Sequence, residues 1–208
     1  MIFLHRQNII NSNYDIVDIG GIEIDIRSCN EGLVLNHDRL EYNEYYPFLY
    51  DELKKLDKSK IVIANVKESG LEEEAIENFN KLKLNYYFLD SQIPDILKLS
   101  KKYPEISKRF IVRVSDVETY NEKFINLINP EYVWLDYTEF DTFDADKYFK
   151  FLDEQIELCG NRKIIIVSPE LYSLDYDYAK LINTFLISKG TNINVCTKRP
   201  EMYKELNV

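Results

Sequence analysis

Cysteine is scarce in this chain of 208 residues, and its three copies, Cys29, Cys159 and Cys196, lie far apart in the sequence. No C-x-x-C pair is present, which argues against a zinc site built from thiolates. An odd number of widely separated thiols is typical of a protein kept in a reducing compartment. We therefore expect reduced cysteines and a cytoplasmic location.

Positive charge, glycine and long apolar runs are also in short supply. The chain holds 26 Lys and Arg against 36 Asp and Glu, and this excess of acids argues against a nucleic-acid partner. Its glycines form neither G-x-G-x-x-G nor a Walker sequence, the usual nucleotide-phosphate loops. No apolar run approaches the roughly 18 residues of a membrane helix, so we expect no transmembrane segment and no signal peptide.

The chain does contain a series of short apolar runs rich in β-branched residues. Such runs predict strands. Leu33–Asn36 either extends the second of them or forms a short hairpin with it. The predicted strands are Ile2–His5, Ile22–Ile26, Ile61–Lys67, Tyr86–Asp90, Phe110–Ser115, Tyr132–Tyr137, Lys163–Ser168 and Ile193–Thr197.

Helical periodicity appears between most of these strands. Asp116 is a candidate N-cap for the third predicted helix, and Glu72 starts an acidic run that we expect to be solvated. The predicted helices are Glu72–Lys81, Ser91–Lys101, Glu118–Ile128, Asp144–Leu158 and Ser173–Ser188.

Strands that alternate with helices build a parallel sheet. Eight strands in this order favour an α/β fold, a compact (β/α)8 or TIM barrel that forms a single domain over residues 1–208. Barrels of this type usually need about 250 residues, so the connections must be short. An open doubly wound sheet is the alternative.

The run Gly21–Arg27 alternates apolar residues with acids. Successive side chains on a strand point to opposite faces, so Glu23 and Asp25 share one face. Two carboxylates on one face repel each other unless a cation, a basic side chain or a shared proton lies between them. The two histidines of the chain, His5 and His37, flank this run in the sequence. The pattern indicates a site assembled from adjacent strands.

Active sites of these barrels lie at the C-terminal ends of the strands, and polar residues end nearly every predicted strand. We expect these side chains to meet at one mouth. Arg113 and Asp136 are additional site candidates, or they pair with each other across the mouth. The residues at the strand ends are His5, Arg6, Asn65, Lys67, Asp90, Arg113, Asp136, Ser168, Thr197 and Lys198.

His5-Arg6, Glu23-x-Asp25 and a segment ending in His37-Asp38 together resemble the glycerophosphodiester phosphodiesterase family, within the phospholipase C-like phosphodiesterase superfamily. The resemblance implies a (β/α)8 barrel and hydrolysis of a small phosphodiester. It further implies that His5 and His37 act as general acid and general base. A divalent cation, Mg²⁺ or Ca²⁺, is implied on Glu23 and Asp25. Arg6 and Lys67 are suited to binding the phosphate.

The chain departs from that family at three points. Asn65 stands where a third acidic metal ligand is expected, and an amide oxygen offers a ligand without charge. Gln7 replaces the glycine expected after His5-Arg6, and the usual insertion after the second histidine is largely missing. These departures support an alternative, a catalytically impaired barrel that binds a phosphate-containing ligand or a partner. No pattern indicates an oligomeric state.

Overall fold

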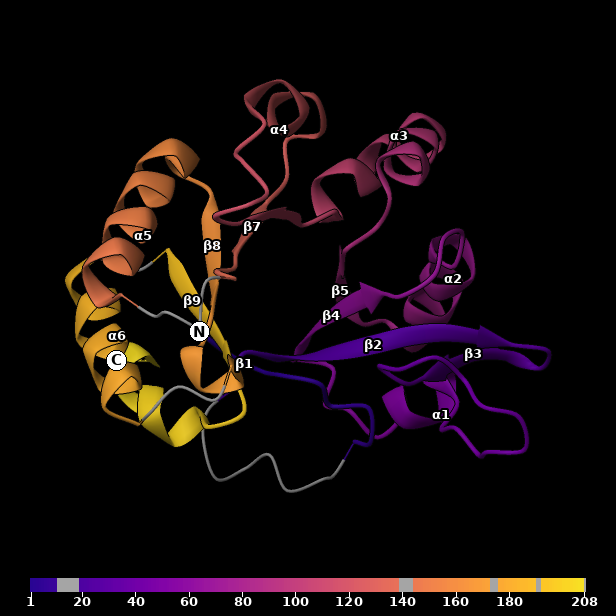
Figure 1. Ribbon diagram of the computed structural model, residues 1–208. Helices are drawn as coiled ribbons and strands as arrows, with labels where there is room; N and C mark the ends of the chain where they lie inside the picture. Colours follow the sequence, from indigo (N-terminus) through magenta and orange to yellow (C-terminus); the bar gives the residue numbers. More distant parts are fainter. Residues whose placement is uncertain (11–18, 139–143, 173–175, 190–191, 208) are drawn as a thin grey trace.

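A computed structural model describes residues 1–10, 19–138, 144–172, 176–189 and 192–207. Within these ranges the strands form one sheet in the order β5-β4-β2-β1-β9-β8-β7-β6, with β3 attached to β2 (Figure 1). The eight strands other than β3 run parallel and form a nearly closed barrel with helices around it. The predicted TIM barrel is therefore confirmed.

The strands follow the predicted order along the chain. Their bounds are β1 Ile2–Leu4, β2 Gly21–Cys29, β3 Gly32–Leu35, β4 Ile61–Val66, β5 Asn85–Leu89, β6 Val112–Val114, β7 Tyr132–Leu135, β8 Lys163–Val167 and β9 Ile193–Thr197.

The helices lie between the strands, on the outside of the barrel (Figure 1). Short 3₁₀ turns at Pro104–Arg109, Pro169–Tyr172 and Pro200–Asn207 supplement them. Among the described residues, no helix has the length and apolar character needed to cross a bilayer. The α-helices are α1 Leu49–Leu53, α2 Glu72–Leu82, α3 Ile93–Lys102, α4 Glu122–Ile128, α5 Ala145–Cys159 and α6 Tyr176–Lys189.

The first and last strands of the chain are neighbours, since β1 pairs with both β2 and β9. An open doubly wound sheet does not bring its terminal strands together in this way, so the alternative is excluded. The barrel closes least well between β5 and β6. There the two strands share the isolated bridge between Phe88 and Phe110, where the Ile111 N–H donates to the Phe88 carbonyl at 2.7 Å. We call this junction the β5–β6 seam.

Successive side chains on each strand point to opposite sides of the sheet, so the buried apolar residues form two separate cores. On β2, Ile22, Ile24 and Ile26 point outward and join the apolar layer beneath the helices. Glu23 and Asp25 therefore point into the barrel. The barrel interior below them is filled by a second apolar cluster, which contains Phe3, Ile63, Tyr87, Leu89, Ile111, Tyr132, Trp134, Ile165, Val167 and Cys196. The acids thus lie above a packed floor, at the end of the barrel where the strands finish.

Two loop predictions are resolved or corrected by the structure. Gly32–Leu35 forms a hairpin with β2, in antiparallel register with Leu35 opposite Ile26. Asp116 is not a helix cap: its carboxylate accepts from the Thr138 N–H at 2.8 Å and ties together the loops after β6 and β7. Helix α4 begins only at Glu122, where the side chain of Asn121 accepts from the Phe124 N–H at 3.0 Å.

One strand boundary and the burial of one acidic residue also differ from the prediction. The strand expected over Phe110–Ser115 is reduced to the three residues of β6, because its first residues pair only at the seam. Glu72 is buried rather than solvated, since it falls on the same face of α2 as Ala75, Ile76 and Phe79. The predicted start of the last helix at Ser173 lies outside the described residues.

Candidate active site

One cavity of about 250 Å³ lies among the C-terminal ends of the barrel strands. It brings together the predicted catalytic, phosphate-binding and metal-binding residues with Arg113 and Asp136, although these come from six different strands or the loops that follow them. The cavity is lined by His5, Arg6, Glu23, Asp25, His37, Asn65, Lys67, Arg113, Trp134, Asp136, Val167, Leu171 and Tyr172.

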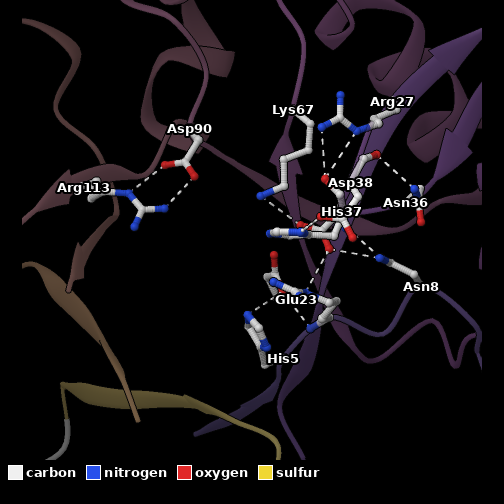
Figure 2. Close-up of polar contacts among 12 residues, drawn as sticks. His5, Asn8, Glu23, Arg27, Asn36, His37, Asp38, Lys67, Asp90 and Arg113 are labelled. Carbon is white, nitrogen blue, oxygen red and sulfur yellow. Dashed lines mark hydrogen bonds and ion pairs between the residues drawn. The ribbon is translucent and has the colours of Figure 1, made fainter. Parts of the chain in front are cut away.

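Glu23 lies at the base of this cavity and is only 1% exposed. Its Oε2 accepts from the Arg6 backbone N–H at 2.7 Å and lies 3.7 Å from His5 Nε2 (Figure 2). Its Oε1 has no hydrogen-bond partner within the described part of the chain. A buried oxygen without a donor is costly, so Glu23 Oε1 is available to a donor or a cation.

The turn after β1 delivers the Arg6 amide to Glu23. Arg6 has a φ of 52°, the left-handed region that L-residues seldom occupy. The Gln7 N–H then donates to the Glu23 carbonyl at 2.7 Å, and the Gln7 side chain donates to the His5 carbonyl at 3.0 Å. The left-handed residue is Arg6 itself, so this turn does not require the glycine that the family resemblance implied at position 7.

Asp25, also 1% exposed, is surrounded by donors. Lys67 Nζ lies 3.0 Å from its Oδ1, whereas Arg6 Nε lies 3.5 Å from its Oδ2. Asn8 donates to the same Oδ2 at 3.0 Å and accepts from the Asp25 N–H at 2.8 Å. These basic side chains offset the repulsion between the two acids that the strand pattern predicted.

The Glu23 carboxyl group binds a proton more tightly than an exposed glutamate does. Burial, and then the charge of Asp25, raise the pKa of Glu23 to about 7, against the opposing effects of the Arg6 and Asn65 amides and of Lys67. The site therefore contains one carboxylate held by cations and a second whose charge is poorly compensated. Such an arrangement favours a positively charged ligand near Glu23.

His5 ends the first strand and is largely enclosed. Burial, together with the positive charges of Arg6 and Lys198, lowers the pKa of His5 to about 4. Its imidazole is accordingly neutral near pH 7. Its Nδ1 has no hydrogen-bond partner among the described residues.

His37 lies on the loop after β3 and is more open to solvent than His5. Its Nδ1 lies 2.9 Å from Asp38 Oδ1, and this hydrogen bond lowers the pKa of Asp38. Its carbonyl accepts from Arg27 at 3.0 Å, so the backbone that carries the ring is anchored to β2 (Figure 2). An imidazole beside a carboxylate is well placed to carry a proton.

The predicted metal ligands meet on the walls of the same cavity. Asn65 lies beside Asp25 in the parallel register of β2 and β4, and its Oδ1 is buried without a hydrogen-bond partner in the described chain. Glu23 Oε1, Asn65 Oδ1 and the Asp25 carboxylate are hard oxygen donors of the kind that Mg²⁺ and Ca²⁺ prefer. The residues therefore fit such an ion. In the described part of the chain, no group of three or more His, Cys, Asp or Glu side chains is arranged so that it could hold a metal ion.

Arg113 and Asp136 occupy the opposite wall and form the ion pair considered in the sequence. Arg113 also binds both carboxylate oxygens of Asp90, with Nε at 2.9 Å from Oδ1 and Nη2 at 2.5 Å from Oδ2 (Figure 2). Asp136 accepts from the Tyr172 hydroxyl and from the Tyr137 N–H. Asp136 is thus engaged by Arg113, Tyr172 and the Tyr137 backbone.

Sequence reasoning missed several contributors to the site. Asn8 anchors Asp25, and Tyr172 binds Asp136, yet neither residue belongs to a recognisable pattern. Trp134 lines the cavity too, beside Arg113 in the register of β6 and β7. Its inward position follows from strand alternation and could have been read from the sequence.

Four of the polar strand ends, Asp90, Ser168, Thr197 and Lys198, do not line the cavity. Ser168 and Thr197 both donate hydrogen bonds to Glu170 in a separate buried network. Ser168 also contacts the Tyr203 hydroxyl at 2.5 Å. These side chains connect β8 and β9 to the chain that follows them, and they do not face the acids.

Comparison with known proteins gives a structural match. No protein-family model matches the sequence, and no curated protein matches it either. Among solved structures, the chain is similar to a phosphodiesterase from Oleispira antarctica, whose structure is in complex with the product sn-glycerol-3-phosphate. The TM-score is 0.65 and the identity 15%, and the match covers 100% of this chain and 96% of the other. At this identity, the likeness supports the barrel fold alone.

Proposed function

We propose that this protein is a metal-dependent phosphodiesterase that hydrolyses a small phosphodiester. The observation that carries the proposal is the arrangement of His5 and His37 around the buried donors Glu23, Asp25 and Asn65 in a single cavity. The similarity to a phosphodiesterase barrel and the motif resemblance both support it.

The charges of the cavity suit an anionic substrate. Arg6 and Lys67 both reach Asp25, and each has hydrogen-bond donors left for phosphate oxygens. Glu23, Asp25 and Asn65 would hold the divalent cation, Mg²⁺ or Ca²⁺, which supplies positive charge to the phosphate as negative charge develops.

The two histidines divide the proton transfers. Neutral His5 accepts the proton of the attacking hydroxyl or water as the new P–O bond forms. His37, held by Asp38, donates a proton to the leaving alcohol as the old P–O bond breaks. Attack by water gives a phosphomonoester and an alcohol. Attack by a neighbouring substrate hydroxyl gives a cyclic phosphate instead.

Asn65 favours a second candidate function. With one ligand uncharged, the barrel would bind the cation more weakly and act as a receptor for a phosphate-containing ligand without turnover. The two functions differ in one measurable respect, the release of an alcohol from phosphorus.

The test is ³¹P NMR of a panel of glycerophosphodiesters incubated with the protein and Mg²⁺ or Ca²⁺. We expect a phosphomonoester or cyclic phosphate signal, and a loss of about 100-fold or more in rate for His5→Gln and for His37→Asn. Tyr42→Asn, on a fully exposed side chain, is the control and should keep the wild-type rate. Metal binding without any hydrolysis would instead support the receptor, and full activity in both histidine variants would rule out their assigned roles.

A further inference from the structure

A second and larger cavity, of about 810 Å³, lies at the β5–β6 seam. Its walls come from the ends of β5 and β6, the start of α3 and the loop leading into α4. Its volume is within the range of about 300–1,000 Å³ that small-molecule sites occupy. The lining residues are Asp90, Ser91, Gln92, Ile93, Pro94, Ile96, Ile111, Val112, Arg113, Glu118, Thr119, Asn121 and Phe124.

Arg113 belongs to both cavities. Its guanidinium pairs with Asp90, a residue of the second cavity, and in Figure 2 Asp90 lies between Arg113 and the labelled residues around Glu23. The seam explains this geometry, because β5 and β6 share only the bridge at Phe88 and Phe110, and no regular ladder separates the two spaces beyond it. The second cavity thus adjoins the catalytic one at Arg113, the lining residue that the two share.

The charged groups of the second cavity are already paired with one another. They are Asp90, Arg113 and Glu118, with the Arg113 guanidinium 2.9 Å from Asp90 and 3.8 Å from Glu118. No other described lining residue is charged. An ionic ligand would therefore have to break the Arg113 pairs, whereas a neutral group would not.

The uncharged part of the lining combines six apolar residues with the polar residues Ser91, Gln92, Thr119 and Asn121. Ile96 and Ile111 are buried at its base, Val112 and Phe124 are half-buried, and Ile93 is 51% exposed at the rim. An exposed isoleucine at the mouth of the cavity gains from contact with an apolar ligand.

We infer that the second cavity holds an alkyl or acyl chain attached to the phosphodiester, so that the substrates of this enzyme are amphiphiles with a single apolar chain. This inference rests on the proposed function, since it takes the phosphate to lie beside Lys67 and the chain to extend past Arg113. The polar cavity alone would not distinguish these amphiphiles from fully polar phosphodiesters.

Alkylphosphonates test the inference, because their C–P bond is not hydrolysed and binding is measured without turnover. Methyl-, butyl-, hexyl- and octylphosphonate are titrated by calorimetry in the presence of Mg²⁺. We expect each added methylene to tighten the Kd by about fourfold, the equivalent of about 0.8 kcal/mol. Methylphosphonate reports the phosphate site alone.

Ile93→Asp provides the matched variant, since it places a charge on the apolar wall at the first residue of α3, where an acid suits the helix. We expect it to remove the dependence on chain length and to leave methylphosphonate binding unchanged. Leu127→Asp, on the exposed surface of α4 outside the cavity, should keep the wild-type dependence.

The outcomes separate the two proposals. A Kd that does not change with chain length, while methylphosphonate binds, overturns the apolar subsite and leaves the phosphodiesterase standing. A chain-length dependence that persists in Ile93→Asp places the chain elsewhere and also overturns the subsite. If no phosphonate binds, including methylphosphonate, the phosphate site itself is wrong and both proposals fail.

Discussion

Asn65 lies beside Asp25 because β2 and β4 pair in parallel with these two residues in register. The amide therefore faces the same cavity as the two acids, with its Oδ1 buried and without a hydrogen-bond partner in the described structure. This position makes Asn65 the residue that sets the charge of the proposed cation site.

Asn65→Asp should strengthen cation binding. A third carboxylate adds a charged ligand, and we expect the Kd for Mg²⁺ or Ca²⁺ to fall about tenfold in calorimetry, or about 1.4 kcal/mol. Without metal, the same variant should unfold at a lower temperature than the wild type, because three acids then share one buried cavity. Asn78→Asp, on α2 away from the cavity, is the control. Unchanged affinity in Asn65→Asp and in Asn65→Ala would exclude residue 65 as a ligand.

Glu23→Gln should make the fold more stable while abolishing cation binding and hydrolysis. The substitution removes a buried, poorly compensated charge but keeps an oxygen that accepts from the Arg6 N–H. In EDTA at pH 8, we expect a gain of about 1–2 kcal/mol in the free energy of unfolding, measured by urea denaturation. Cation binding and hydrolysis should both be lost. A variant that is less stable in EDTA would mean that the Glu23 charge stabilises the fold.

Arg113→Met should destabilise the barrel at its weakest junction. It leaves Asp90 and the buried Asp136 without their cation, and we expect a loss of about 2–3 kcal/mol in urea unfolding. The double variant Arg113→Met/Asp136→Asn should recover part of that loss, since it also removes the stranded charge. Arg39→Met, at an exposed position, should change stability by less than about 0.5 kcal/mol. Equal losses in the single and double variants would show that the ion pair contributes little.

Gly21→Ala should prevent normal pairing of β2 with β4. A Cβ at this position would lie 2.2 Å from the Ile61 carbonyl oxygen and 2.9 Å from Phe3 Cε1, and the first of these atoms belongs to the backbone. We expect a loss of about 3 kcal/mol or more, measured by thermal or urea unfolding. Gly20→Ala is the matched control, because its Cβ would meet only the Met1 side chain, which is partly exposed and able to move. Similar stabilities for the two variants would contradict the close approach of the strands.

The barrel and most of the residues that line its cavity follow from the sequence pattern, although Ser168 and Thr197 turn to Glu170 instead. The order of strands and helices predicts a parallel sheet, and the period of two along β2 places Glu23 and Asp25 on the inner face whatever the surroundings. Because parallel strands of a barrel end at one mouth, residues as distant as His5 and Asp136 had to converge. Boundaries set by single side-chain contacts were less predictable, as Asp116 and α4 show.

Only the tertiary structure decided how the charges at that mouth are shared. The left-handed turn at Arg6, the hydrogen bonds of Asn8 to Asp25 and the pairing of Arg113 with Asp90 all join segments that are distant in sequence. The opening at the β5–β6 seam likewise depends on how far two strands continue to pair, which local propensity does not encode. The strand pattern settles which residues face the cavity, whereas burial and long-range contacts settle which of their charges remain unpaired, and thus what the cavity binds.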